Sequence, residues 1–165
     1  MPGSGKSTVC AELKANGYEA YDGDEDHLAK WYNIATGAAV KREDEERTPE
    51  FVQAHSRDMS RETVEELVSK ARDKPVFLCA DPENEDDLRD LFSQIFALVV
   101  DEDTRKHRLA TRTNNKWGKL PHEVEYSQAF QQKWEADYKK FAYITLDSSQ
   151  PPGTLVDQIL EKLGV

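Results

Sequence analysis

The chain has 165 residues, with 32 acidic and 22 basic side chains and a formal net charge of −10. This length suits one domain with its own hydrophobic core, and so negative a surface argues against nucleic-acid binding. No apolar run is long enough to span a membrane, and no signal peptide is recognisable. The widely spaced Cys10 and Cys79 indicate buried thiols in a reducing compartment. We expect a cytoplasmic monomer or homodimer that binds neither nucleic acid nor membranes.

The pattern of apolar residues predicts helices that alternate with short strands. In chain order we expect a helix at 7–16, a strand at 18–21, helices at 27–32 and 50–73, a strand at 75–80, a helix at 86–93, a strand at 95–100, helices at 104–111 and 122–140, a strand at 142–146 and a helix at 153–163. The polar segment 33–49 is predicted to be a loop or mobile flap. Continuous apolar strands that alternate with helices favour an α/β fold with a parallel sheet, whose ligands bind at the carboxyl ends of the strands.

Residues 3–8 read GSGKST, which matches the second half of the phosphate-loop (Walker A) motif. The glycines allow backbone N–H groups to close around phosphate oxygens, and the following helix points its positive end at the same place. Lys6 is expected to reach the β- and γ-phosphates, Ser7 to bind Mg²⁺, and Thr8 to make a further phosphate contact. The candidate nucleotide-binding residues are therefore Gly3, Ser4, Gly5, Lys6, Ser7 and Thr8.

Two carboxylates follow the next strand, in the sequence Asp22-Gly23-Asp24. A carboxylate at this position can hold Mg²⁺ through water, or can accept the proton of a substrate hydroxyl. We expect Asp22 to bind the metal and Asp24 to act as the base. Which of the two is the base stays open at this point. The alternative is a turn with solvated acids, since Asp-Gly is a common turn pair.

A cluster of basic residues precedes and includes a predicted loop; its members are Arg105, Lys106, His107, Arg108, Arg112, Lys116 and Lys119. Arg108 and Arg112 are four residues apart and share a helix face. Arginine side chains suit the oxygens of a migrating phosphoryl group, so these two are candidate charge stabilisers. The alternative is a basic helix neutralised by acids such as Glu102, and His107 is interpreted as a surface residue.

With these motifs in this order, the chain resembles the small P-loop kinases, a group that includes nucleoside monophosphate, shikimate and gluconate kinases. The resemblance covers nearly the whole chain and implies one domain over 1–165, a sheet of order 2-3-1-4-5, an acceptor-binding segment at about 25–72 and a lid at about 108–125. It also implies that ATP lies on the phosphate loop, with its adenine near Arg108 and the turn that contains Ser149 and Pro151.

The resemblance implies an ATP- and Mg²⁺-dependent enzyme that transfers the γ-phosphoryl group to a small-molecule acceptor, most simply a nucleoside or nucleotide. Its catalytic residues would be Lys6, Asp24, Arg108 and Arg112. Arg57 and Arg61 are candidates for contact with the acceptor, or for surface ion pairs with acids such as Glu65. Two alternatives stay open: a kinase for another hydroxylated metabolite, as in shikimate or gluconate kinases, and an ATP-binding module with little or no kinase activity.

The resemblance also implies a central strand before the phosphate loop, and the sequence begins at Met1 without one. We expect that the recorded start is internal or trimmed, or that another segment or subunit fills this position. Adding the upstream residues, about ten with the missing glycine of the motif, is then expected to raise both stability and ATP affinity. Thermal unfolding and ATP titration check this prediction, and no change in either quantity would contradict it.

Overall fold

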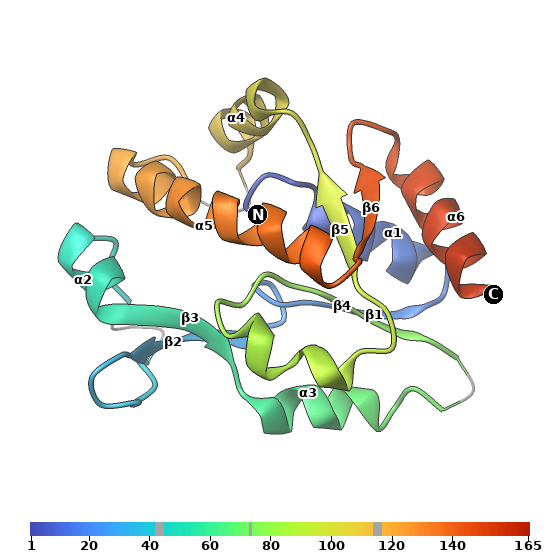
Figure 1. Ribbon diagram of the computed structural model, residues 1–165, viewed down its shortest axis with the longest axis horizontal. Coiled ribbons are helices and arrows are strands. Elements are labelled where there is room, and N and C mark those ends of the chain that lie inside the picture. Colours follow the sequence, from blue (N-terminus) through green and yellow to red (C-terminus); the bar gives the residue numbers. More distant parts are fainter. Residues whose placement is uncertain (42–44, 73, 114–116) are drawn as a thin grey trace. The chain divides into compact units, whose positions relative to one another are not determined.

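The computed structural model describes residues 1–41, 45–72, 74–113 and 117–165 (Figure 1). The chain forms two compact units: unit 1 comprises Met1–Asn16 and Gln94–Val165, and unit 2 comprises Gly17–Ser93. Both units combine helices with a pair of parallel strands, so the predicted α/β class is confirmed. None of the helices in the described part of the chain is long and apolar enough to cross a lipid bilayer.

Unit 1 contains the phosphate-loop motif and the C-terminal half of the chain. Its elements are α1 (Lys6–Ala15), β5 (Phe96–Val99), α4 (Glu102–Thr111), α5 (Pro121–Lys140), β6 (Ile144–Asp147) and α6 (Pro152–Leu163). Strands β5 and β6 pair in parallel, with Phe96 opposite Ile144. Helices α1 and α6 pack together (Figure 1), and each carries buried apolar residues, such as Leu13 in α1 and Val156 in α6. Each element of this unit was predicted within a few residues of its observed bounds.

Unit 2 contains the remaining elements, which are β1 (Glu19–Asp22), β2 (Ala29–Asn33), α2 (Pro49–Ala54), β3 (His55–Met59), α3 (Arg61–Val68), β4 (Val76–Cys79) and the 3₁₀ turns η2 (Glu85–Asp87) and η3 (Arg89–Leu91). Strands β1 and β4 pair in parallel, whereas β2 and β3 form an antiparallel pair. Ala29, Met59, Val64 and Leu88 form a buried cluster that joins this pair to α3 and the 3₁₀ turns.

Three predicted helices of unit 2 are wrong. The predicted helix at 27–32 is instead strand β2, in which Trp31 is buried while its neighbour Lys30 is exposed. The predicted helix at 50–73 is divided into α2, β3 and α3, because Thr48 and Ser60 each cap a separate helix by accepting a backbone N–H bond. The predicted helix at 86–93 is two short 3₁₀ turns.

The strand pairs agree with part of the predicted sheet order. In the predicted order 2-3-1-4-5, strand 1 is the one expected before the phosphate loop, so strands 2, 3, 4 and 5 correspond to β1, β4, β5 and β6. The order places strand 2 beside strand 3 and strand 4 beside strand 5, and β1 indeed pairs with β4 and β5 with β6. Among the described residues, no strand pairs with the other edge of β4 or of β5. Every residue of β4 is half-buried rather than buried, in contrast to the expected cover on both faces. The full order remains a prediction.

The turn after β1 passes very close to the end of β4. The Gly23 N–H donates to the Cys79 carbonyl at 3.0 Å, and the Gly23 carbonyl accepts from Leu28 and Ala29. A Cβ placed on Gly23 would lie 2.8 Å from the Cβ of Ala80, which is shorter than a normal carbon–carbon contact. Glycine at this position therefore holds the Asp22–Asp24 turn against β4.

We predict that Gly23→Ala lowers the free energy of unfolding by about 1–3 kcal/mol, because the new methyl group collides with Ala80. Ala80→Gly removes the collision, so the double variant is expected to be more stable than Gly23→Ala alone. Chemical denaturation of the three variants measures the effect. Gly153→Ala is the control, because a Cβ there meets only Glu12, at 3.7 Å. Equal destabilisation of the single and double variants would contradict the prediction.

Candidate functional site

The phosphate loop of unit 1 adopts a conformation that glycine permits. Gly3 and Gly5 have φ angles of 83° and 96°, in the left-handed region that side chains with a Cβ rarely occupy. Ser4 lies between them and is buried, and its N–H donates to the Met1 carbonyl at 3.3 Å. The motif residues therefore form a closed turn that leads directly into α1.

Within the described part of the chain, no side chain caps the amino end of α1. Gly5 occupies the N-cap position, no side chain caps the helix, and its first turn carries no acid. Ser7 and Thr8 are exposed in this turn. The ammonium group of Lys6 lies back across the loop and donates to the Met1 carbonyl at 2.7 Å. A helix end of this kind, with a lysine beside it, attracts an anion.

Arg108 lies beside the phosphate loop. Its guanidinium donates to the Ser148 carbonyl at 2.7 Å and to the Ser148 hydroxyl at 3.1 Å. A Cβ placed on Gly5 would lie 3.6 Å from Nη1 of Arg108. The structure thus brings together the loop, Arg108 and the turn between β6 and α6, which the resemblance placed near one another.

The two other predicted residues of that turn are exposed. Ser149 donates its N–H to the Asp147 carboxylate at 2.9 Å, and this hydrogen bond lowers the pKa of Asp147. Pro151 occupies the N-cap position of α6. Both residues are accessible to a ligand held next to Arg108.

Two other basic residues of α4, Arg105 and Lys106, are already paired with an acid. Arg105 is buried and makes two hydrogen bonds to Glu102, both 2.9 Å long, which lower the pKa of that carboxylate. Lys106 pairs with the same Glu102 at 3.4 Å, and His107 is exposed as predicted. For Arg105 and Lys106 the alternative interpretation, neutralisation by acids, is therefore correct. Lys116 lies outside the described residues.

The predicted lid contains a tightly bonded turn at residues 117–120, called the lid turn below. Arg112 donates to the carbonyl of Trp117, and Lys119 donates to the carbonyl of Arg112. The buried Glu123 carboxylate accepts the N–H groups of Gly118, Lys119 and Leu120 at 2.9–3.1 Å. Glu123 is not among the residues predicted from the sequence, although a glutamate two residues after a proline at a helix start is a capping signal.

In unit 2, Asp22 is buried at the end of β1 and organises the turn that follows. Its Oδ1 accepts the N–H groups of Asp24 and Glu25 at 2.9 and 3.0 Å. Its Oδ2 is buried and has no hydrogen-bond partner among the described residues. A buried carboxylate oxygen of this kind calls for a cation or a donor.

Asp24 is exposed and forms an ion pair that the sequence did not specify. Nη2 of Arg57, on β3, lies 3.1 Å from Asp24, and Nη1 lies 3.9 Å from Glu45. The Arg57 guanidinium also lies over the ring of Trp31, 5.8 Å from its centre. Arg61, the other candidate for the acceptor, instead pairs with Glu65 and Asp90 at 3.0 and 2.6 Å.

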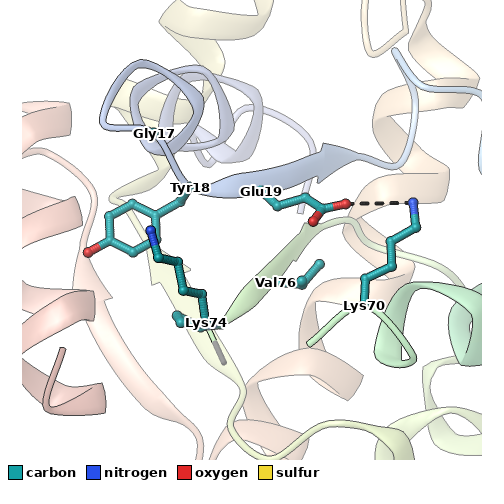
Figure 2. A pocket seen from close by; sticks show the side chains of 7 residues that line it. Gly17, Tyr18, Glu19, Lys70, Lys74 and Val76 are labelled. Carbon is teal, nitrogen blue, oxygen red and sulfur yellow. Dashed lines mark ion pairs between the residues drawn. The ribbon is translucent and has the colours of Figure 1, made fainter. Parts of the chain in front are cut away.

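A small pocket of about 200 Å³ lies at the opposite, amino ends of β1 and β4. Figure 2 shows Lys70 paired with Glu19 across it, at 3.6 Å, with Lys74 beside Tyr18. A hydrogen bond to the Tyr21 hydroxyl raises the pKa of Lys70. Since ligands of parallel sheets bind at the carboxyl ends of the strands, this pocket is not part of the candidate site.

The glycine loop, the uncapped helix and the parallel strands define the class of P-loop nucleotide-binding proteins. Residues 1–131 match the family described as AAA domain (AAA_18), and the chain belongs to that family. The fold is similar to that of an unliganded sugar kinase from Janibacter sp. HTCC2649, with 21% identity over 99% of this chain and 90% of that one and a TM-score of 0.52. A gluconokinase from Sinorhizobium meliloti 1021 is also similar, with 20% identity over 98% of this chain and 86% of that one and a TM-score of 0.49. No curated protein sequence matches the chain.

We predict that Glu123→Ala lowers the free energy of unfolding by about 1–3 kcal/mol, because three N–H groups of the lid turn lose their acceptor and the bond from Gly118 is buried. Glu123→Gln keeps one oxygen acceptor and should have a smaller effect. Urea denaturation measures both variants, with Glu125→Ala as an exposed control on the same helix. A Glu123→Ala chain as stable as the control would contradict this role.

Proposed function

We propose that the protein is an ATP-dependent phosphotransferase that moves the γ-phosphoryl group of ATP to a hydroxyl of a small molecule. The uncapped amino end of α1, with Lys6 folded across the loop and Arg108 beside it, carries this proposal. Backbone N–H groups, an ammonium and a guanidinium are the groups that bind the phosphates of a nucleoside triphosphate.

The proposed roles follow from the chemistry of each side chain. Lys6 exchanges its hydrogen bond to the Met1 carbonyl for bonds to phosphate oxygens. Arg108, which is held by its hydrogen bond to Ser148, stabilises the negative charge of the transferred phosphoryl group. Arg112 is the second charge stabiliser. Phosphoryl transfer depends chiefly on positioning and electrostatics, so these groups would suffice without a covalent intermediate.

Each of the two residues predicted for Mg²⁺, Ser7 in unit 1 and Asp22 in unit 2, has a side chain that suits the ion. The buried Oδ2 of Asp22 lacks a partner among the described residues, and the Ser7 hydroxyl is exposed beside Lys6. No group of three or more His, Cys, Asp or Glu side chains in that part of the chain forms a metal site by itself. Mg²⁺ commonly takes one or two protein ligands and completes its shell with water and phosphate. We expect Ser7 and Asp22 to be its protein ligands, and the bound ion would neutralise phosphate charge.

Asp24 is the proposed base. Its carboxylate is exposed and is oriented by Arg57, so it can accept the proton of an acceptor hydroxyl. Arg57 is already shared by Asp24 and Glu45, and a phosphate on the acceptor would compete with both carboxylates. We therefore favour a neutral, hydroxylated acceptor over a nucleotide.

A nucleoside and a sugar both satisfy this condition. The resemblance seen in the sequence favoured a nucleoside or nucleotide, whereas the structural similarity to a sugar kinase brings sugars into consideration. A panel of nucleosides, sugars, sugar acids and nucleotides separates these classes, because only a true acceptor accelerates ADP release. ATP binding without acceleration by any of them would favour an ATP-binding module.

We predict that, with the best acceptor of the panel, Lys6→Ala lowers kcat/KM about a hundredfold or more through lost phosphate stabilisation. Asp24→Asn is expected to lower kcat by about a hundredfold with little change in ATP affinity, because the base is lost and the nucleotide site is not. A coupled ADP-release assay and ATP titration measure both variants.

Lys14→Ala is the matched control for Lys6→Ala, because Lys14 is an exposed lysine at the other end of α1. Acceptor-dependent turnover that survives Asp24→Asn unchanged would remove Asp24 from the mechanism. Turnover that survives Lys6→Ala would overturn the assignment of the phosphate loop.

A further inference from the structure

Helix α4 is packed directly against the backbone of the phosphate loop. A Cβ placed on Gly3 would lie 3.1 Å from Cγ of Arg105, 3.1 Å from Cγ of Leu109 and 3.2 Å from the Arg105 carbonyl oxygen. These distances leave no room for a side chain, so the loop backbone at Gly3 rests on α4. A displacement of this backbone would press on Arg105 and Leu109.

The same Leu109 side chain touches a second glycine, in the lid turn. A Cβ placed on Gly118 would lie 3.1 Å from Cδ2 of Leu109 and 3.5 Å from its Cδ1. Leu109 is only 4% exposed, so its side chain is enclosed between its neighbours. One leucine therefore separates the phosphate loop from the lid turn, with backbone at both contacts.

The lid turn would move as a body if it were displaced. Three of its N–H groups are bonded to Glu123 in the first turn of α5, and Arg112 is bonded to the carbonyl of Trp117. A displacement transmitted to Gly118 would therefore reach Arg112, a proposed charge stabiliser. Close-packed interiors transmit such displacements because they contain few voids that can absorb them.

We propose that Leu109 is a positioning residue that couples the phosphate loop to the lid turn, so that nucleotide at Gly3 changes the surroundings of Trp117 and Arg112. This inference rests on the proposed function, because it takes ATP to be the ligand of the loop. Leu109 itself makes no contact with the reacting atoms. It acts through the two glycines.

Trp117 provides a direct reporter of the lid turn. The chain has three tryptophans, at positions 31, 117 and 134. Trp31→Phe and Trp134→Phe in one chain leave Trp117 as the only tryptophan. ATP with Mg²⁺, without an acceptor, is expected to change the Trp117 emission in this background.

In the same background, Leu109→Ala should remove most of the ATP-induced change in Trp117 emission at saturation, because the smaller side chain leaves a void between the two glycines. Leu109→Met keeps the volume of the side chain and should restore most of the change. Leu155→Ala is the control, since Leu155 is similarly buried, in α6. If Leu109→Ala does not fold, Leu109→Val replaces it, with a smaller expected reduction in the same direction.

Calorimetric titration of ATP distinguishes failure of the inference from failure of the proposed function. Absence of ATP binding by the chain before any Leu109 substitution would defeat the proposed function. If ATP binds and the change in Trp117 emission is as large in Leu109→Ala as in Leu155→Ala, the coupling role of Leu109 is overturned and the proposed function is not. ATP binding without any change in Trp117 emission would overturn it as well.

Discussion

The contact between helix α4 and the phosphate loop is the constraint on which the candidate site depends. Gly3 is held against Arg105 and Leu109, and Gly5 lies next to Arg108. Because the glycines present only backbone, α4 approaches close enough for Arg108 to reach both the loop and Ser148. A salt bridge within α4, between Arg105 and Glu102, orients the Arg105 side chain that lies against Gly3. The glycines of the loop and the close approach of α4 therefore depend on each other.

Local sequence signals were sufficient for unit 1. The GSGKST motif, the apolar runs that became β5 and β6, and the apolar spacing along α6 each specify their element without reference to distant residues. Asp101 likewise caps α4 by accepting the N–H of Thr104 at 2.8 Å, a signal that lies within four residues. The nearness of Arg108 to the turn after β6 followed from the resemblance, which supplied the strand order that the sequence pattern lacks.

Unit 2 was predicted less well because its structure depends on pairing between distant segments. The residues from His55 to Met59 lie within an apparent helical pattern, but they form a strand because β2 offers five partners to them. Side chains of Glu83 and Asn84 then bond to the backbone of Arg57 and Met59, which fixes β3 further. Asp24 and Arg57 are 33 residues apart in the sequence, and no local sequence pattern predicts their ion pair. Gly23 was noticed only as a turn residue, whereas its contact with Ala80 requires knowledge of β4.

The position of Lys6 has a thermodynamic consequence for any anion that binds the loop. Its ammonium already donates to the Met1 carbonyl at 2.7 Å, so a ligand gains only the difference between a charged and a neutral acceptor. A doubly charged phosphate is a much stronger hydrogen-bond acceptor for the ammonium than the carbonyl is, and this difference is smaller for a neutral or singly charged group. A ligand of the loop would therefore compete with the Met1 carbonyl for Lys6, and a strong acceptor would draw the lysine away more readily than a weak one.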